Sequence, residues 1–79
     1  MRDTQLKAFH AVALHNGFSR AAEMLNQTQP TLSEQVRRLE QSYDTLLFHR
    51  DARQIRLTEA GEDLFRLTRT FFEVEEQIG

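Results

Sequence analysis

Five side chains between residues 29 and 37 have types and spacing that suit contacts with nucleic-acid bases. At about 100° per residue along a helix they fall on one arc: Gln29, Pro30, Ser33, Glu34 and Arg37. Gln, Ser and Arg carry groups that hydrogen-bond to base edges, and the small apolar ring of proline can contact a thymine methyl group. The chemistry that this arc offers is therefore non-covalent recognition of base edges.

Two helices joined by a tight turn would position this arc. In residues 18–25 the apolar side chains recur at i, i+3, i+4 and i+7: Phe18, Ala21, Ala22 and Leu25. Residues 26–28 are short and polar, which favours a turn. A second apolar stripe then follows at helical spacing: Leu32, Val36, Leu39 and Tyr43. This is the layout of a helix-turn-helix whose second helix reads bases, although periodicity alone equally allows an ordinary helical hairpin with a solvated polar face.

The ends of these helices are also predicted from the sequence. Asp3 or Thr4 can cap a first helix that runs to about residue 15, and Gly17 suits a left-handed residue at its end. Ser19 and Thr28 suit the N-caps of the next two helices. Pro30 then falls in the first turn of the third helix, where its missing N–H costs nothing.

Beyond the third helix, two short apolar runs at residues 46–48 and 55–57 flank a charged tip that includes Arg50 and Arg53. This pattern predicts a small β-hairpin. Thr58 can cap a final helix, along which apolar residues are spaced 4, 3, 4, 3, 4: Ala60, Leu64, Leu67, Phe71, Val74 and Ile78. Such a heptad seam favours helix-to-helix pairing, so we expect a dimer formed through Leu64, Leu67, Phe71, Val74 and Ile78. The seam still runs where the chain stops, which suggests a fragment of a longer protein.

Length, charge and composition narrow the classes of protein. A chain of 79 residues makes one small domain, near the lower limit for a self-sufficient core, and this too favours a partner chain. Residues 1–57 hold eight Lys and Arg against six Asp and Glu, whereas residues 58–79 hold two against six. The acidity therefore lies away from the predicted reading helix, but the positive charge there is weak for a DNA-binding protein. The chain has no cysteine, no apolar run of membrane-spanning length and no signal-peptide pattern.

The chain also resembles a known family along essentially its whole length, the N-terminal DNA-binding domain of the LysR-type transcriptional regulators. The stretches that carry the resemblance are 18–22 (Phe-Ser-Arg-Ala-Ala), 28–33 (Thr-Gln-Pro-Thr-Leu-Ser), 35–36 (Gln-Val), 39–40 (Leu-Glu), 47–50 (Leu-Phe-His-Arg) and 57–61 (Leu-Thr-Glu-Ala-Gly). Each fragment is weak by itself, but their order and spacing together are highly specific.

The resemblance implies a mainly α fold, a winged helix-turn-helix of three helices and a β-hairpin wing over residues 1–57, followed by a linker helix over 58–79 that pairs two subunits. It implies a cytoplasmic homodimer that binds double-stranded DNA at an interrupted palindromic operator and needs no cofactor. A small-molecule effector would act only through a C-terminal domain, which this chain lacks.

By the same resemblance, individual residues acquire expected roles. Base contacts in the major groove would come from Gln29, Pro30, Ser33 and Glu34. Phosphate contacts, which position the protein without specifying sequence, would come from Ser19, Thr31, Arg37 and Arg38. Arg53 at the tip of the wing would enter the minor groove, where narrow A·T-rich tracts attract arginine.

Three positions depart from the family pattern. Gln27 stands where an apolar turn residue is common, so the turn is expected to be more exposed. Asp44 follows Tyr43 where leucine and glycine are frequent, and it is expected to adopt a left-handed conformation. Glu34 is acidic at a variable position; it can accept a hydrogen bond from cytosine N4 but is repelled by phosphate, which should narrow the range of operators.

Other classes of protein find less support. His10 and His15 would diverge by about 140° on a helix and have no cysteine beside them, so no metal site is expected. No catalytic triad, paired carboxylates or glycine-rich phosphate loop is present in the sequence, so no enzymatic activity is expected. A protein-interaction module built on the seam remains the alternative, and it would leave the face of Gln29, Ser33 and Arg37 without a function.

Overall fold

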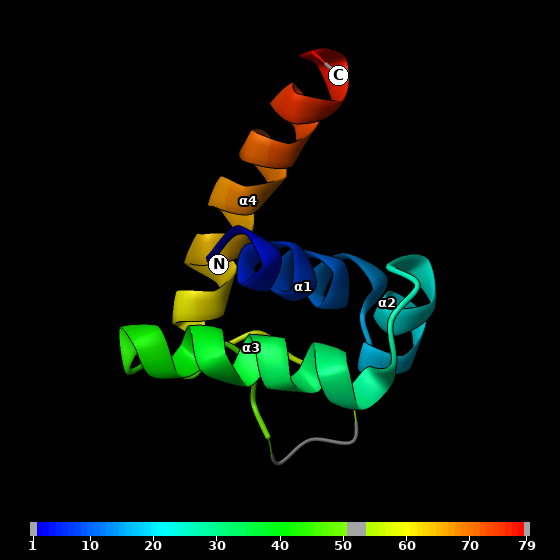
Figure 1. The fold of residues 1–79 in the computed structure, drawn as a ribbon. Helices are drawn as coiled ribbons and strands as arrows, with labels where there is room; N and C mark the ends of the chain where they lie inside the picture. Colours follow the sequence, from blue (N-terminus) through cyan, green and yellow to red (C-terminus); the bar gives the residue numbers. More distant parts are fainter. Residues whose placement is uncertain (1, 51–53, 79) are drawn as a thin grey trace.

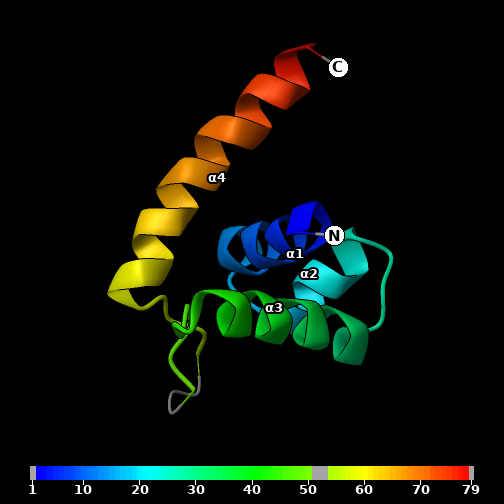
Figure 2. The same cartoon turned by 60° about the vertical axis from the view of Figure 1, so that its left-hand side comes forward.

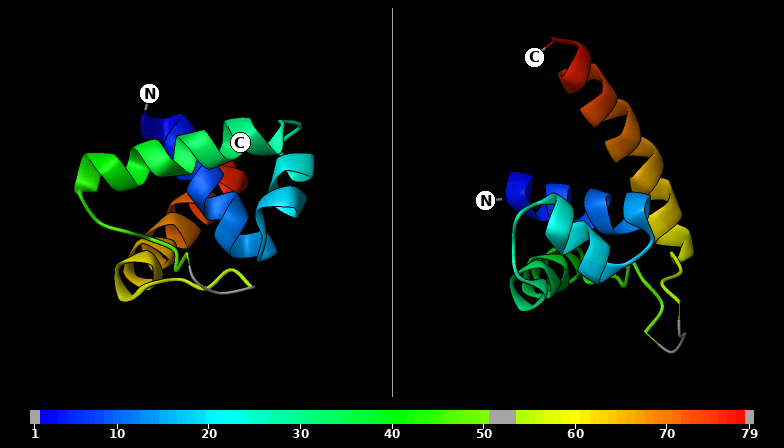
Figure 3. Two further views of the ribbon diagram at one scale, coloured as in Figure 1. Left: turned by 90° about the horizontal axis from the view of Figure 1, so that it is seen from below. Right: turned by 90° about the vertical axis from the view of Figure 1, so that its right-hand side faces the viewer.

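Four α-helices form the framework of the part of the chain that the structure, a computed structural model, describes: residues 2–50 and 54–78. They are α1 (Arg2–His15), α2 (Phe18–Met24), α3 (Gln29–Tyr43) and α4 (Glu59–Ile78). Helices α1, α2 and α3 pack into a three-helix body, and α4 projects away from it like an arm (Figures 1 and 2). Seen from below, α3 crosses α1 (Figure 3, left). Within the described ranges, no helix is both long and apolar enough to cross a membrane.

The core lies between α1, α2 and α3. The largest fully buried side chains are Phe9, Val12, Leu32, Val36, Leu39 and Phe48. The rings of Phe9 and Phe48 lie 5.4 Å apart between centroids, so the segment after α3 contributes to the same core. The prediction for Tyr43 is wrong: its side chain is 43% exposed. Tyr43 is the last residue of α3, beyond the turns of α3 that α1 covers (Figure 1).

Two of the predicted helix starts are wrong. Helix α1 begins at Arg2, so Asp3 lies in its first turn, where a negative charge favours the helix dipole, and does not cap it. Helix α2 begins at Phe18 and its N-cap is Gly17, so Ser19 is not the cap. The earlier start is explained by Phe18, whose ring packs against that of Phe48 at 5.8 Å and is thereby held within the helix.

The left-handed residue after α1 is also not the expected one. Asn16 has φ 59° and takes this conformation, which Asn tolerates better than most residues, whereas the φ of Gly17 is 170° and extended. Asn26 has φ 57° and makes the turn between α2 and α3. In this turn Gln27 is half-buried, with its side-chain oxygen fully shielded, so the expected greater exposure is not found.

The other predicted caps are confirmed. The Thr28 hydroxyl accepts a hydrogen bond from Thr31 N–H at 3.3 Å, and Pro30 lies in the first turn of α3. Asp44 is left-handed, with φ 53° and ψ 44°. The Thr58 hydroxyl accepts from Gly61 N–H at 3.0 Å and donates to the Leu46 carbonyl at 2.7 Å. Thr58 therefore joins the start of α4 to the segment that follows α3.

The predicted β-hairpin is not confirmed as a pair of strands. Phe48 and Leu57 form a single antiparallel bridge, flanked by hydrogen bonds from His49 N–H to Arg56 O at 2.8 Å and from Thr58 N–H to Leu47 O at 3.0 Å. The buried side chains of Leu47 and Phe48 are consecutive, so this segment packs into the body and does not alternate between two faces as a half-buried strand would. Arg53, the expected tip residue, lies outside the described residues.

Gly61 permits a close approach between α4 and the segment after α3. A Cβ atom at Gly61 would lie 2.1 Å from the Leu47 carbonyl oxygen, which belongs to the backbone and cannot move aside easily. At Gly17, by contrast, a Cβ atom would have no heavy atom within 4 Å. Adding a side chain is therefore expected to lower the free energy of unfolding at Gly61 but not at Gly17.

We predict that Gly61→Ala lowers the free energy of unfolding by about 1–3 kcal/mol, the usual cost of overpacking. Gly17→Ser should raise it by roughly 0.5–1 kcal/mol, because serine is a better N-cap and restricts the unfolded chain. Urea denaturation of the two variants beside the unchanged chain checks both signs. A Gly61→Ala variant as stable as the unchanged chain would contradict the close approach.

Candidate nucleic-acid interface

Residues 29–38 of α3 present a polar face to solvent, opposite the buried stripe of this helix. Leu32, Val36 and Leu39 are fully buried on one side of the helix and so fix which side remains outside. The predicted contact residues of α3 lie on the accessible remainder: Gln29, Pro30, Thr31, Arg37 and Arg38 are exposed, and Ser33 and Glu34 are half-buried. The structure therefore brings the residues predicted on α3 onto one accessible surface.

The start of α2 adjoins the start of α3. Ser19, which is exposed, lines a shallow groove together with Gln29 from α3 and Gln54 from the segment before α4. Arg20 lines the same groove. Neither Arg20 nor Gln54 belongs to the arc on α3, so the sequence pattern gives no signal for them, and only the fold places them beside Gln29.

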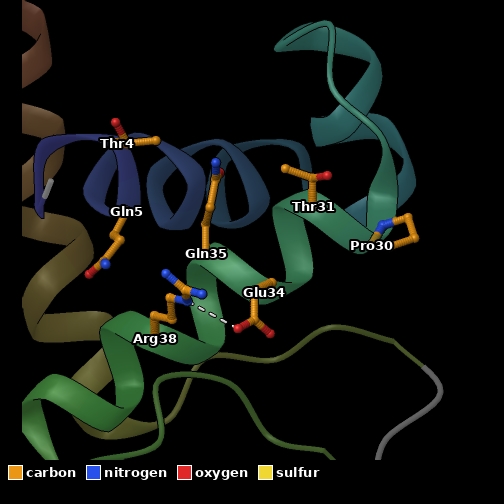
Figure 4. Close-up of a pocket in the computed structure, with 7 residues that line it drawn as sticks. All are labelled: Thr4, Gln5, Pro30, Thr31, Glu34, Gln35 and Arg38. Atoms are coloured by element: carbon orange, nitrogen blue, oxygen red, sulfur yellow. Dashed lines mark hydrogen bonds and ion pairs between the residues drawn. The ribbon is translucent and has the colours of Figure 1, made fainter.

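A second groove runs between the N-terminal part of α1 and α3. Thr4 and Gln5 face it from α1, and five residues line it from α3: Pro30, Thr31, Glu34, Gln35 and Arg38 (Figure 4). Glu34 and Arg38 project from the same side of α3 and are joined by a hydrogen bond (Figure 4). Arg38 thus lies at one margin of the exposed face of α3, and this margin adjoins α1.

Glu34 lies between two arginines of its own helix. Arg37 donates to its carboxylate from Nε at 2.9 Å and from Nη2 at 2.6 Å, and Arg38 donates from Nε at 3.0 Å. The hydrogen bonds from Arg37 and then Arg38 lower the pKa of Glu34 to about 2, and the bond to Glu34 raises the pKa of Arg37. All three side chains are substantially exposed, so this cluster faces any ligand of α3.

Glu40 is a buried carboxylate that attaches the segment after α3 to α3 itself. Glu40 is only 5% exposed, and its Oε2 atom accepts hydrogen bonds from Leu47 N–H at 2.8 Å and from Phe48 N–H at 3.3 Å. Its other oxygen pairs with the guanidinium of Arg50. The sequence offered one signal for this role, since Glu40 follows Val36 by one turn and so lies beside the buried stripe.

The seam of α4 divides between the body and the solvent. Leu64 is half-buried and packs against the core. The other four predicted seam residues are exposed: Leu67 by 69%, Phe71 by 53%, Val74 by 49% and Ile78 by 81%. A row of apolar side chains therefore lies open along the arm.

A separate set of side chains attaches α4 to α1. The His10 Nδ1 atom lies 2.9 Å from the Thr68 hydroxyl, and the His10 ring lies 5.5 Å from Phe65 and 4.9 Å from Phe72. Burial, and then the positive charge of Arg69, lower the pKa of His10 from its usual value of 6.5. The sequence analysis assigned no role to His10; the structure uses it to pack α1 against α4.

Comparison with known proteins places this arrangement in a family. Residues 4–62 match the family described as bacterial regulatory helix-turn-helix protein, lysR family. The RuBisCO operon transcriptional regulator of Allochromatium vinosum is 49% identical over 65 residues, which are 82% of this chain and 22% of that protein.

Two solved structures show the same arrangement bound to DNA. The complex of the BenM DNA-binding domain with catB site 1 DNA superposes with a TM-score of 0.87 at 28% identity, over 94% of this chain and 83% of that one. Vibrio fischeri DarR, also solved with DNA, superposes with a TM-score of 0.82 at 34% identity, over 95% of this chain and 26% of that one.

The chain belongs to the lysR family of bacterial regulatory helix-turn-helix proteins, a class of DNA-binding transcriptional regulators. It spans about a fifth of the length of the Allochromatium vinosum relative. The resemblance inferred from the short motifs is thereby confirmed, and so is the mainly helical fold.

We predict that Glu40→Ala lowers the free energy of unfolding by at least about 2 kcal/mol, because two buried N–H donors lose their acceptor at about 1–3 kcal/mol each. Glu40→Gln should cost less, since its amide oxygen can still accept from Leu47 and Phe48. Glu23→Ala, which changes an exposed glutamate of α2, serves as the control and should stay within about 0.5 kcal/mol. Urea denaturation measures all three, and equal stability of the two alanine variants would contradict the role of Glu40.

Proposed function

We propose that this chain binds double-stranded DNA sequence-specifically as a homodimer, with α3 in the major groove. The observation that carries the proposal is the polar face of residues 29–38 of α3, held outward by the burial of Leu32, Val36 and Leu39. Helix-turn-helix proteins read bases with the N-terminal residues of the second helix of the motif, which is α3 in this chain. BenM and DarR, which share the fold, were solved as complexes with DNA, and this supports DNA as the ligand.

Within this proposal the side chains of α3 divide into two groups. Gln29, Pro30 and Ser33 lie at its start and would meet base edges, Gln29 by a bidentate contact to adenine N6 and N7. Thr31 and Arg38 lie toward the margin of the face and would contact phosphates.

Neighbouring segments would add contacts to the DNA backbone. Ser19 and Arg20 from α2 share a groove with Gln29, so a duplex that meets Gln29 would run close to both. The assignment of Arg53 to the minor groove, which rests on the sequence, belongs to the same proposal.

The proposal gives the two parts of the chain separate roles. Residues 1–57 would recognise DNA and residues 58–79 would join the subunits and lead to an effector-binding domain elsewhere in the whole protein. The proposed setting is the cytoplasm, where a regulator of this kind meets the chromosome.

The proposed dimer rests on the open apolar row of α4. Leu67, Phe71, Val74 and Ile78 are exposed in the single chain, although burial of each such side chain is worth roughly 1.5–3 kcal/mol. A second copy of α4 has the same row and would cover it by coiled-coil packing. Two copies joined in this way would present two α3 helices, as an interrupted palindromic operator requires.

We predict that Gln29→Ala weakens binding to the preferred operator by about 1–3 kcal/mol, the worth of one bidentate base contact. The salt dependence of binding should stay unchanged, because no charge is removed. Gln77→Ala, at an exposed position near the end of α4, is the matched control and should bind like the unchanged chain. Fluorescence titrations over a salt series provide the measurement, and full affinity of Gln29→Ala would show that the start of α3 does not read bases.

We predict that Leu67→Asp converts the dimer to a monomer, because a charge within the seam would be buried without a partner. Its melting temperature should fall through loss of the partner, since Leu67 is 69% exposed within one chain and contributes little to the fold itself. Leu67→Met keeps an apolar side chain and should stay dimeric. Sedimentation equilibrium decides the outcome; an unchanged chain that is monomeric at high micromolar concentration would rule out the dimer.

A further inference from the structure

Among residues 2–50 and 54–78, the Arg37 guanidinium hydrogen-bonds only to Glu34, and one of its edges has no partner there. Arg37 uses Nε and Nη2 to bind the two oxygens of Glu34, at 2.9 and 2.6 Å. A guanidinium carries five N–H donors, so three remain, on Nη1 and on the outer side of Nη2. Two of these donors, one on Nη1 and one on Nη2, lie side by side on the outer edge, and such a pair is what a bidentate contact to guanine O6 and N7 requires.

Arg37 also occupies the middle of the polar face. On a helix it lies about 40° around the axis from Ser33, whereas Arg38 lies about 140° from Ser33. Arg38 accordingly lines the groove beside α1, together with Thr4 and Gln5, and is held to Glu34 by a single hydrogen bond (Figure 4). Pro30 and Glu34 line that groove as well, and Arg37 lines another groove beside Asp44, so the helical angle is what distinguishes the two arginines. By that angle Arg37 lies nearer than Arg38 to the base-facing residue Ser33.

Glu34 has little capacity left for a base of its own. Its carboxylate already accepts three hydrogen bonds from the two arginines, out of about four acceptor positions. To accept from cytosine N4 it would have to give up its bidentate bond to Arg37 while surrounded by phosphates. With its pKa lowered to about 2, Glu34 stays ionised and holds Arg37 in one orientation, and the cluster of one carboxylate and two guanidinium groups keeps a net positive charge.

We propose that Arg37 reads a guanine in each half-site through its free guanidinium edge, and that Glu34 is the positioning residue that orients it. The arc on α3 had already placed Arg37 among side chains suited to base edges, whereas the family resemblance gave the base contact to Glu34 and a phosphate contact to Arg37. Our proposal decides between the two and gives Glu34 a positioning role. It rests on the proposed insertion of α3 into the major groove, and it makes Arg37 a determinant of specificity.

The test starts from binding sites that the 79-residue chain selects from a random-sequence DNA duplex library. Each base pair of the selected site is then changed in turn, and affinities are measured for the unchanged chain, Arg37→Ala, Glu34→Gln and the matched control Arg38→Ala. The unchanged chain should prefer guanine at one position in each half-site by about 5- to 150-fold, the ratio that corresponds to about 1–3 kcal/mol. Arg37→Ala should lose this preference, whereas Arg38→Ala should keep it while binding every sequence more weakly.

Glu34→Gln should reduce the preference at the same position without moving it, because a neutral amide holds Arg37 less firmly. A site carrying 7-deazaguanine at that position lacks the N7 acceptor but leaves cytosine N4 untouched. It should weaken binding by the unchanged chain and leave Arg37→Ala unaffected. Circular dichroism confirms that each variant keeps its helices, as substitutions of exposed residues should.

The outcomes separate this inference from the function on which it rests. If the chain selects no sequence, both the proposed function and the role of Arg37 are overturned. If it selects a site but Arg37→Ala keeps every base preference, or 7-deazaguanine has no effect, only the role of Arg37 is overturned. In the case where Glu34→Gln alone abolishes a preference, Glu34 reads the base directly.

Discussion

The burial of one stripe of α3 is the constraint on which the rest of this structure depends. Leu32, Val36 and Leu39 are fully buried against the body, in a core that α1 supplies with Phe9 and Val12. A helix held along one side cannot rotate about its axis without exposing those side chains, at roughly 1.5–3 kcal/mol each. The orientation of the polar face follows directly, because it is whatever the buried stripe leaves outside.

A second set of contacts fixes the segment between α3 and α4 to that same helix. Phe48 packs its ring on Phe9 and Phe18, which attaches the segment to the core, and Glu40 accepts from the N–H groups of Leu47 and Phe48. Ring packing and hydrogen bonds to Glu40 therefore hold the segment at two adjacent residues, Leu47 and Phe48. Because Thr58 and Gly61 then tie the start of α4 to Leu46 and Leu47, the direction in which the arm leaves the body depends on this same short segment.

Helix α4 has two different apolar sides, one that packs against α1 and one that is exposed. One side carries Phe65, Thr68 and Phe72 and meets His10 of α1. An adjacent side carries the exposed row from Leu67 to Ile78. The acidic residues of the chain are concentrated in this region, which places negative charge on the arm and leaves the body with the positive excess that a phosphate backbone attracts.

The sequence by itself determined the helices, the family and the residues of the polar face. Local signals suffice for these: apolar spacing predicts α2, α3 and the seam of α4, and Thr28, Pro30, Asp44 and Thr58 act through the backbone of nearby residues. Where local signals were outweighed by packing, the prediction was wrong. Phe18 joined α2 because its ring meets Phe48, and Tyr43 stayed exposed because the covering helices end before it.

Only the tertiary structure decided the contacts between residues far apart in the chain. The acceptor role of Glu40, the packing of His10 on Thr68 and the neighbourhood of Ser19, Gln29 and Gln54 all join separate segments, and no periodicity records such pairings. The ion pair of Glu34 and Arg37 is different, since its spacing of three residues was visible in the sequence, but its bidentate geometry was not. Side-chain direction depends on which face of the helix is buried, and that is settled only when the helix has packed.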